Sequence, residues 1–398
     1  MVGAMIDACF GEPLAAPVRV RVGTQRSATL AATWRRFAPL AAHIGLTRLA
    51  ELTRLDALGV PVFAAIRPRS KSLSSAQGKG TTALAAKVSA LMESLETWCA
   101  EERAPDRVAT AQALGAATIA RARALPRHPR RFVTTASRPW VRGVSLADGR
   151  AAWVPWESVT LDCVAAARTP PLFDVSSNGL ASGNTLVEAI VHGTTEVIER
   201  DAEATWRLTG HDRRVILDTV VDPTVRSLVA RITGAGARLW LWDLTSDVGV
   251  PVFGCGVMHD PREPSWRAVG FYQGFGCHVD PAIAMSRAIT EAVQTRMTYI
   301  SGARDDFFPH DYQRATDRRV LARIWQRYAA PPDESIDARD YARPRVRDLG
   351  EVLAHVVAQL AAAGSPEVIV VDLRVPALGV PVVKVLVPGR ATRLEGLG

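Results

Sequence analysis

Three long stretches of the chain place apolar residues with the period of an α-helix. They cover approximately residues 82–102, 185–207 and 281–301. The second stretch follows Asn184-Thr185 and the third begins at Asp280-Pro281. A short polar cap and a proline in the first turn both suit the free N–H groups at a helix start. The pattern therefore predicts three long helices.

Stretches rich in β-branched residues lie between and after these helices, at 238–257 and 367–387. The pattern Gly-Val-Pro-Val occurs at 59–62, 249–252 and 379–382, each time a few residues after an acidic residue followed by leucine. Proline belongs at the start or the edge of a strand. The three copies are either unrelated strand starts or a structural duplication. Because strands and helices do not alternate regularly, we expect an α+β fold with mixed sheets and one domain over residues 1–398.

The composition permits a large core, since 48% of the 398 residues are hydrophobic. The formal net charge of +8 suggests a nucleic-acid surface. However, the basic residues are almost all arginines, they are scattered, and no recognition motif accompanies them. We therefore expect no nucleic-acid partner. The five cysteines form no C-x-x-C pair, and no apolar run approaches the ~18 residues of a membrane span. We expect a cytoplasmic protein without disulfides and without a membrane partner.

Each predicted helix carries polar side chains along one face, at spacings of three and four residues. Neither of the first two helices offers a lysine four residues after its paired acids. The stripes on the first, second and third helix are, in turn, Ser89, Glu93 and Glu96; Glu188, His192, Glu196, Glu199 and Arg200; and Arg287, Glu291 and Gln294, with Arg296 nearby.

Carboxylates that converge in a partly buried place repel one another unless a cation lies between them. Mg²⁺ takes oxygen ligands and shares them with substrate phosphates. A di-iron site requires Glu-x-x-His motifs, and these helices contain none, so we reject that alternative. The chain also lacks a P-loop. Gly78-Lys79-Gly80 before the first helix resembles one only in part, as a backbone and a lysine that could meet phosphate.

Three segments resemble the sequence motifs of the YcaO family. They are Ser75–Gly80 with Ser89–Glu96, then Asn178–Ala189 continuing to Glu196–Asp201, then Arg287–Arg296 continuing to Asp306. The similarity extends over about residues 20–390. It implies a fold that binds ATP without a P-loop, on Mg²⁺ ions held by Glu-x-x-Glu acids.

The resemblance also implies a role for individual residues. The residues expected to bind Mg²⁺ are Glu93, Glu96, Glu188, Glu196 and Glu199. The residues expected to bind ATP are Arg26, Thr33, Ser89, Glu93, Asn184, Glu188, Glu196, Arg200, Arg287, Gln294 and Arg296. One family position differs, because Glu96 is followed by Thr97 instead of arginine.

Members of the family phosphorylate a backbone amide oxygen of a ribosomally made precursor peptide, which a nucleophile then replaces. A side chain gives an azoline, sulfide gives a thioamide, and an amine gives an amidine. The C-terminal segment lacks the alternating prolines of many azoline-forming members, and no leader-binding domain precedes the motifs. We therefore expect a thioamide-forming enzyme that works with a TfuA-like or leader-binding partner, and a homodimer. A non-catalytic ATP-binding partner and a basic RNA-associated protein remain as alternatives.

Overall fold

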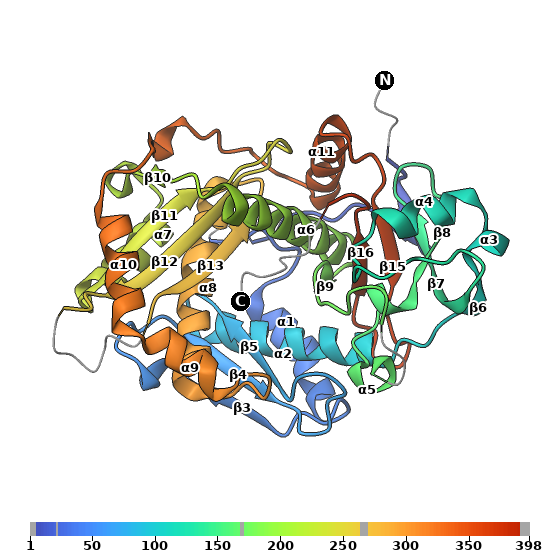
Figure 1. The fold of residues 1–398 in the computed structure, drawn as a ribbon, viewed down its shortest axis with the longest axis horizontal. Helices are drawn as coiled ribbons and strands as arrows, with labels where there is room; N and C mark the ends of the chain where they lie inside the picture. Colours follow the sequence, from blue (N-terminus) through green and yellow to red (C-terminus); the bar gives the residue numbers. More distant parts are fainter. Residues whose placement is uncertain (1–4, 21–22, 168–170, 263–269, 391–398) are drawn as a thin grey trace.

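The computed structural model describes residues 5–20, 23–167, 171–262 and 270–390. Within these ranges the strands form three larger sheets and one small hairpin (Figure 1). The hairpin joins β1 (Ala8–Cys9) to β2 (Glu12–Pro13). The mixture of sheets and helices confirms the α+β prediction.

The first sheet has the order β3-β4-β5 and packs against α2 (Ala83–Glu101). Its strands are β3 (Arg48–Glu51), β4 (Val62–Ile66) and β5 (Ser75–Lys79). The preceding segment contains α1 (Leu30–Phe37), η1 (Ala38–Ala41) and η2 (Thr53–Leu55). Helix α1 contacts α2, which brings the N-terminal segment close to the first helix stripe.

The second sheet has the order β13-β12-β11-β10-β14 and packs against α8 (Pro281–Ser301). Its strands are β10 (Arg213–Val215), β11 (Ala237–Asp243), β12 (Val252–His259), β13 (Tyr272–Cys277) and β14 (Glu334–Ile336). The helices around it are η4 (Leu217–Thr219), α7 (Pro223–Gly234), α9 (Pro309–Thr316), α10 (Arg318–Ala329) and η5 (Ala338–Asp340).

The third sheet has the order β6-β7-β15-β16-β9, with β8 paired to β7, and packs against α6 (Leu186–Thr209). Its strands are β6 (Arg107–Thr110), β7 (Ser137–Ser145), β8 (Ala151–Pro155), β9 (Leu180–Ser182), β15 (Ile369–Asp372) and β16 (Val382–Leu386). The remaining helices are α3 (Ala111–Leu114), α4 (Ala116–Ala124), η3 (Trp156–Ser158), α5 (Cys163–Ala166) and α11 (Leu349–Ala362), of which α11 contacts α6.

The three Gly-Val-Pro-Val segments begin equivalent strands, which supports structural duplication. Each lies in a hairpin with the strand before it and is followed in space by a third strand and a long helix. We call these units repeat one (β3, β4, β5, α2), repeat two (β15, β16, β9, α6) and repeat three (β11, β12, β13, α8). Repeat two takes its hairpin from the end of the chain and its last strand and helix from the middle.

The register of the strands is the same in the three repeats. Phe63 lies opposite Glu51 on one side and Gly78 on the other. Phe253 lies opposite Asp243 and Gly276 in the same way, and the third set is Val383, Asp372 and Ala181. Agreement at every strand of three hairpins is not expected of unrelated strand starts.

Close packing of helix on strand requires a very small residue at the crossing. A Cβ added to Gly78 would lie 2.0 Å from the backbone nitrogen of Ala90 on α2, and one added to Gly276 would lie 2.2 Å from the carbonyl oxygen of Ala284 on α8. In repeat two the strand carries Ala181, and Gly193 on α6 provides the space instead. The helices can therefore lie directly on the sheets, which fixes the direction of their polar faces.

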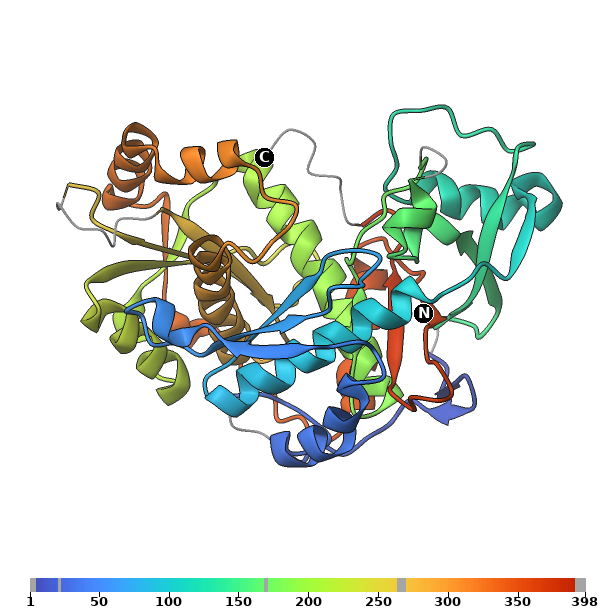
Figure 2. The ribbon, with the colours of Figure 1, turned by 90° about the horizontal axis from the view of Figure 1, so that it is seen from below.

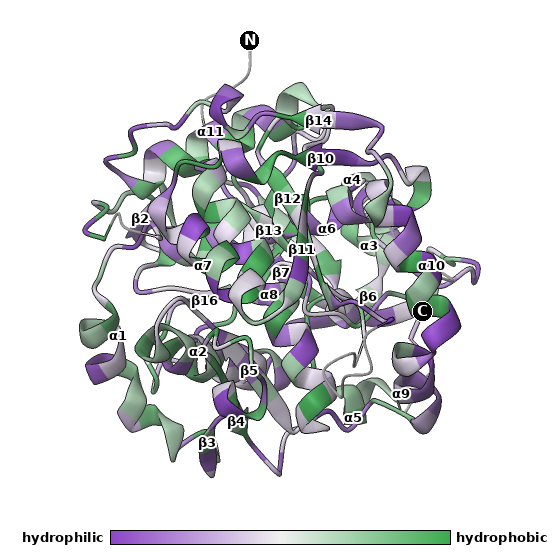
Figure 3. Cartoon of the chain, turned by 90° about the vertical axis from the view of Figure 1, so that its left-hand side faces the viewer, coloured by the Kyte–Doolittle hydropathy of each residue, from purple (hydrophilic) through white to green (hydrophobic). Residues whose placement is uncertain are grey.

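Figures 1 and 2 show α2, α6 and α8 meeting near the centre of the molecule, each on its own sheet. The contacts are cyclic: α2 also touches β9, α6 touches β13, and α8 touches β5. Apolar residues fill the space between helices and sheets, whereas a peripheral helix such as α9 is largely hydrophilic (Figure 3). Within the described ranges, no helix is both long enough and apolar enough to cross a bilayer.

Candidate functional site

The three central helices begin in the same way relative to their strands. A cap residue three positions after the strand end accepts a hydrogen bond from the first turn: Thr82 for α2, Thr185 for α6 and Asp280 for α8. Each cap side chain satisfies an N–H that the helix leaves free. Because strand end and helix start share one register, equivalent helix positions face the same central space.

The polar stripes predicted from the sequence occupy equivalent positions in the three helices. Eleven residues after the cap lie Glu93, Glu196 and Glu291. One turn further along lie Glu96, Glu199 and Gln294, and one turn earlier lie Ser89, His192 and Arg287. We call Glu93, Glu96, Glu196, Glu199 and Glu291 the acid cluster.

One carboxylate from each of the first two helices accepts hydrogen bonds from the strand end of the next repeat. The backbone N–H and the hydroxyl of Ser182, at the end of β9, donate to Oε1 of Glu96 at 2.8 and 2.6 Å. The backbone N–H of Cys277, at the end of β13, donates to Oε2 of Glu199 at 2.8 Å. These bonds fix the direction of both carboxylates.

The third helix, α8, contacts the last strand of repeat one through different residues. The amide nitrogen of Gln294 donates to the carbonyl oxygen of Gln77 on β5 at 2.6 Å. At the end of the same strand, Nζ of Lys79 lies 2.6 Å from Oε2 of Glu291. The structure therefore gives Lys79, which the sequence singled out only weakly, a direct place in the cluster.

For the cluster carboxylates of α2 and α6, burial outweighs the compensating contacts. Burial, assisted by mutual repulsion, raises the pKa of Glu93 and of Glu196 to about 7 and that of Glu96 to about 8. Burial and the neighbouring Glu291 raise the pKa of Glu199 as well. A cation between such carboxylates would lower their pKa values and keep them ionised at neutral pH.

Two arginines approach the cluster from one side. The guanidinium of Arg200 lies 2.9 Å from Glu203, 3.4 Å from Glu291 and 3.7 Å from Glu199. Burial alone would lower the pKa of Arg200, but Glu291 and Glu199 raise it well above its usual range. The guanidinium of Arg287 lies 3.9 Å from Glu199. Both arginines are partly exposed and can reach an anion in the central space.

The N-terminal segment is bound to the start of α6. The guanidinium of Arg26 and the backbone N–H of Ser27 donate to Glu188 at 3.1 and 2.9 Å. Asn184 links the two sides, because it donates to Glu188 at 3.1 Å and accepts from the hydroxyl of Thr33 at 2.9 Å. Burial raises the pKa of Glu188, but Arg26 and the Ser27 hydroxyl outweigh it and hold that pKa below its usual value.

Arg296 does not join these residues. It lies on the opposite face of α8 from Glu291, is fully buried, and binds both carboxylate oxygens of Asp56 at 2.7 and 2.9 Å. A guanidinium without exposed surface cannot reach the central space, so the expectation that Arg296 binds ATP is not supported. Every other predicted site residue lies on the stripes or at the Arg26–Asn184 contact.

Sequence reasoning missed Ser27, Ser182 and Cys277 and singled out Lys79 only weakly. Three of them act from strand ends that are distant in sequence from the acids they contact. The available signal was positional, because Lys79, Ser182 and Cys277 all lie three residues before a helix cap. Recognising it requires knowing that the three units are equivalent.

The donor set fits a magnesium-bound nucleotide. Among the described residues, no three acid, histidine or cysteine side chains surround one point closely enough to hold a metal ion. Mg²⁺ commonly takes only one or two carboxylates and completes its shell with waters and phosphates. The two pairs of carboxylates on α2 and α6, of which Glu199 is buried and the other three are half-buried, have raised pKa values and suit such shared binding.

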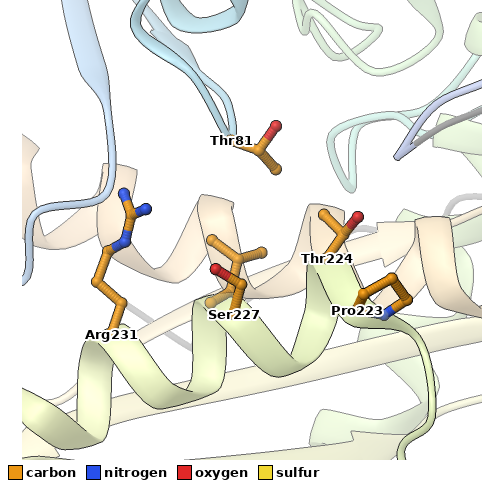
Figure 4. A pocket seen from close by; sticks show the side chains of 6 residues that line it. Thr81, Pro223, Thr224, Ser227 and Arg231 are labelled. Atoms are coloured by element: carbon orange, nitrogen blue, oxygen red, sulfur yellow. The ribbon is translucent and has the colours of Figure 1, made fainter.

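A separate pocket of about 380 Å³ lies outside the cluster. Thr81 lines it from the loop before α2, and Thr224, Ser227 and Arg231 line it from α7 (Figure 4). Thr81 precedes the helix cap, whereas Glu93 lies three helical turns further along α2, at a distance of roughly 16 Å along the axis. The pocket contains none of the acids, so the argument for a functional site rests on the cluster.

Comparison with known proteins agrees with this geometry. Residues 77–391 match the family described as YcaO cyclodehydratase, ATP- and Mg²⁺-binding. The chain is 37% identical to an uncharacterised protein of the tfuA 3′ region of Rhizobium leguminosarum bv. trifolii, over 93% of this chain and 90% of that protein. It is 36% identical to a Mycobacterium tuberculosis protein, over 93% of this chain and 83% of that one.

Solved structures share the fold. The YcaO protein of Methanopyrus kandleri, bound with AMPPCP and Mg²⁺, has a TM-score of 0.70 and 26% identity, and the match covers 94% of each chain. A heterocyclase in complex with substrate and cofactor has a TM-score of 0.77 and 25% identity. That match covers 94% of this chain but 54% of the heterocyclase. The chain belongs to the YcaO family of ATP- and Mg²⁺-binding proteins.

Proposed function

We propose that this protein uses ATP to phosphorylate a backbone amide oxygen of a ribosomally made precursor peptide, which sulfide then converts to a thioamide. One observation carries the first part: Glu93, Glu96, Glu196 and Glu199 occupy equivalent positions on α2 and α6, and burial and neighbouring acids raise their pKa values. Retaining such charge without a cation is costly. This argues for a working ATP site and against a site kept only for assembly.

The residues divide into two groups. Glu93, Glu96, Glu196 and Glu199 are proposed to bind the magnesium ions that bridge the triphosphate. Glu188 already accepts hydrogen bonds from Arg26, Ser27 and Asn184. We therefore assign Glu188 to holding the N-terminal segment against α6, in place of the metal binding that the motif alone suggested.

The remaining polar groups suit the nucleotide. Arg200 and Arg287 provide positive charge beside the cluster, and Ser89, Thr33 and Asn184 provide neutral donors. Gln294 is bound to the backbone of β5 and is assigned to supporting that strand. Phosphoryl transfer depends mainly on positioning and on neutralising charge. The arrangement provides both without a covalent catalyst.

The proposed reaction has two steps. The amide oxygen attacks the γ-phosphorus, the bond to the β-phosphate oxygen breaks, and ADP leaves. Sulfide then attacks the amide carbon, phosphate leaves with the original oxygen, and loss of a proton gives the thioamide. The protein's part in both steps is to hold charge and exclude water.

We propose sulfide as the nucleophile because of a related protein. A relative with 37% identity over nearly its whole length comes from a tfuA region, so we propose a TfuA-like partner for this chain as well. Azoline formation remains the second candidate, because a heterocyclase shares the fold with a TM-score of 0.77. The homodimer stays a prediction.

Mass spectrometry separates the two products. A precursor peptide encoded beside the gene is incubated with the enzyme, the TfuA-like protein and ATP, with and without a sulfide source. A thioamide gains the mass difference between sulfur and oxygen and requires sulfide. Loss of water without sulfide would move the protein to azoline formation, and the Glu199→Gln variant controls for reactions that do not depend on the site.

A further inference from the structure

The third repeat of the cluster differs in charge from the other two. Repeats one and two each place two carboxylates at the equivalent helix positions, Glu93 with Glu96 and Glu196 with Glu199. Repeat three has a single carboxylate, Glu291, followed by the neutral Gln294. Of the three central helices, only α8 has a cationic side chain at the strand end beside it, and this is Lys79 on β5 of repeat one.

The strand ends themselves are equivalent. Ser182, Cys277 and Lys79 each pair with the residue that begins the neighbouring strand and each lie three residues before a helix cap. Ser182 and Cys277 offer uncharged groups to the acids beside them. At the same place Lys79 offers an ammonium group, 2.6 Å from Glu291.

The charge of Lys79 reaches all three helices. Burial alone would raise the pKa of Glu291, but Lys79 and then Arg200 lower it to about 2. On α2, burial raises the pKa of Glu93 and Lys79 opposes this effect. On α6, burial lowers the pKa of His192, and Lys79 adds to this effect after Arg287 and Arg26. Its ammonium group lies at the end of β5, beside α8 and 2.6 Å from Oε2 of Glu291.

We propose that Lys79 is a resident cation of the nucleotide site: it takes the place of a divalent ion in repeat three and binds the triphosphate together with the ions of repeats one and two. The Lys79–Glu291 pair then keeps the third repeat neutral before and after each turnover. Lys79 is a positioning residue in this proposal. The inference rests on binding of magnesium and nucleotide and does not depend on the peptide product.

The repeats suggest the variants. Lys79→Ser with Gln294→Glu gives the contact between α8 and the end of β5 the residue types of the contact between α2 and the end of β9, two glutamates beside a serine. With two carboxylates and no ammonium group, repeat three should bind a divalent ion of its own. Saturating binding of Mn²⁺ in the presence of a non-hydrolysable ATP analogue should rise by about one ion per chain. An unchanged number of ions in a folded, nucleotide-binding double variant would overturn the proposal.

Single variants keep the test independent of the double variant. In Lys79→Met the affinity for the analogue should fall about ten-fold at low Mg²⁺, the scale of one charge-assisted contact, and should recover as Mg²⁺ is raised. Lys79→Arg keeps the charge and should bind nearly as the parent does. Unchanged affinity and magnesium dependence in Lys79→Met would also overturn the proposal.

The control is Lys87→Met. Lys87 lies on α2 outside the cluster, with Nζ 4.3 Å from the ring centroid of Trp34, and its variant should match the parent in both measurements. A matching loss of affinity in Lys87→Met would overturn the specific role of Lys79. If the parent protein does not bind the analogue in a magnesium-dependent way, the proposed function fails. That result is distinct from the failure of the Lys79 proposal.

Discussion

Two kinds of buried acid lie on the same helices and have opposite environments. On α2, Glu101 binds Arg67 at 2.6 Å and accepts hydrogen bonds from Ser70 and Ser72. Two turns earlier on the same helix, Glu93 has a pKa raised to about 7, chiefly by burial. The chain thus compensates Glu101 fully, whereas at Glu93 burial outweighs the compensating charges.

Helix α8 takes part in two compensated ion pairs. On one face Arg296 and Asp56 form a bidentate pair without exposed surface. On the other face Glu291 pairs with Lys79 at 2.6 Å and has a lowered pKa, unlike the cluster acids of α2 and α6. Compensated acids stabilise the fold, whereas the under-compensated ones mark the place where a cation and its anionic ligand are expected to bind. Four predictions test this distinction.

The largest effect is expected from neutralising one cluster acid. Glu96→Gln or Glu199→Gln keeps the shape of the side chain but removes a charge that a divalent ion requires. ATP turnover should fall by at least about 10²–10³-fold, while the melting temperature stays the same or rises because repulsion is relieved. A variant that melts like the parent and consumes ATP at the parent rate would show that the acid is not a ligand.

The opposite pattern is expected at the compensated pair. Arg296→Met leaves Asp56 buried without its bidentate partner, and the free energy of unfolding should fall by about 3–5 kcal/mol. Urea titration measures this loss, and adding Asp56→Asn should restore part of it. Full stability in the single variant would remove the distinction between structural and functional acids.

Three of the cluster acids, Glu93, Glu96 and Glu196, also predict a dependence on pH. Their pKa values of about 7 to 8 lie above those of an unfolded chain. Ionising these half-buried acids destabilises the folded state. The free energy of unfolding of the ligand-free protein should therefore fall as the pH rises from about 5 through 8. Nucleotide with Mg²⁺ needs the ionised forms, so its affinity should rise between pH 6 and 8. Calorimetry on the parent and on Glu93→Gln checks this, because the variant should show a flatter profile.

The smallest effect is expected at Glu188. Arg26 is about one-third exposed, so its pairing with Glu188 is partly screened by solvent. Arg26→Met should lower stability by about 1 kcal/mol or less, measured by urea titration, and should weaken nucleotide binding by loosening the N-terminal segment. A Glu188→Gln variant that loses ATP turnover as completely as Glu199→Gln would instead restore Glu188 as a metal ligand.

Much of the fold and site could be predicted because it is local. Helix periodicity and caps placed α2, α6 and α8 to within about two residues, and the acid stripes follow from that spacing. The Gly-Val-Pro-Val segments identified three strand starts. These features depend on residues a few positions apart.

The rest depends on contacts between distant segments. Repeat two joins β15 and β16 to β9, and no local pattern reveals that order. The bonds from Ser182 to Glu96 and from Cys277 to Glu199 cross between repeats. Arg296 was expected at the site from the family resemblance, but it lies five residues after Glu291 on another face of α8, where it binds Asp56.

Calorimetric titration with a non-hydrolysable ATP analogue, with Mg²⁺ and then with a chelator, tests the central claim most directly. The acid cluster predicts that the analogue binds with Mg²⁺ and no longer binds in the chelator. It also predicts that a Glu96→Gln, Glu199→Gln double variant, which still melts like the parent, does not bind the analogue in either condition. Equal affinity with and without Mg²⁺, or in parent and double variant, would contradict the claim that these carboxylates hold the nucleotide through a metal ion.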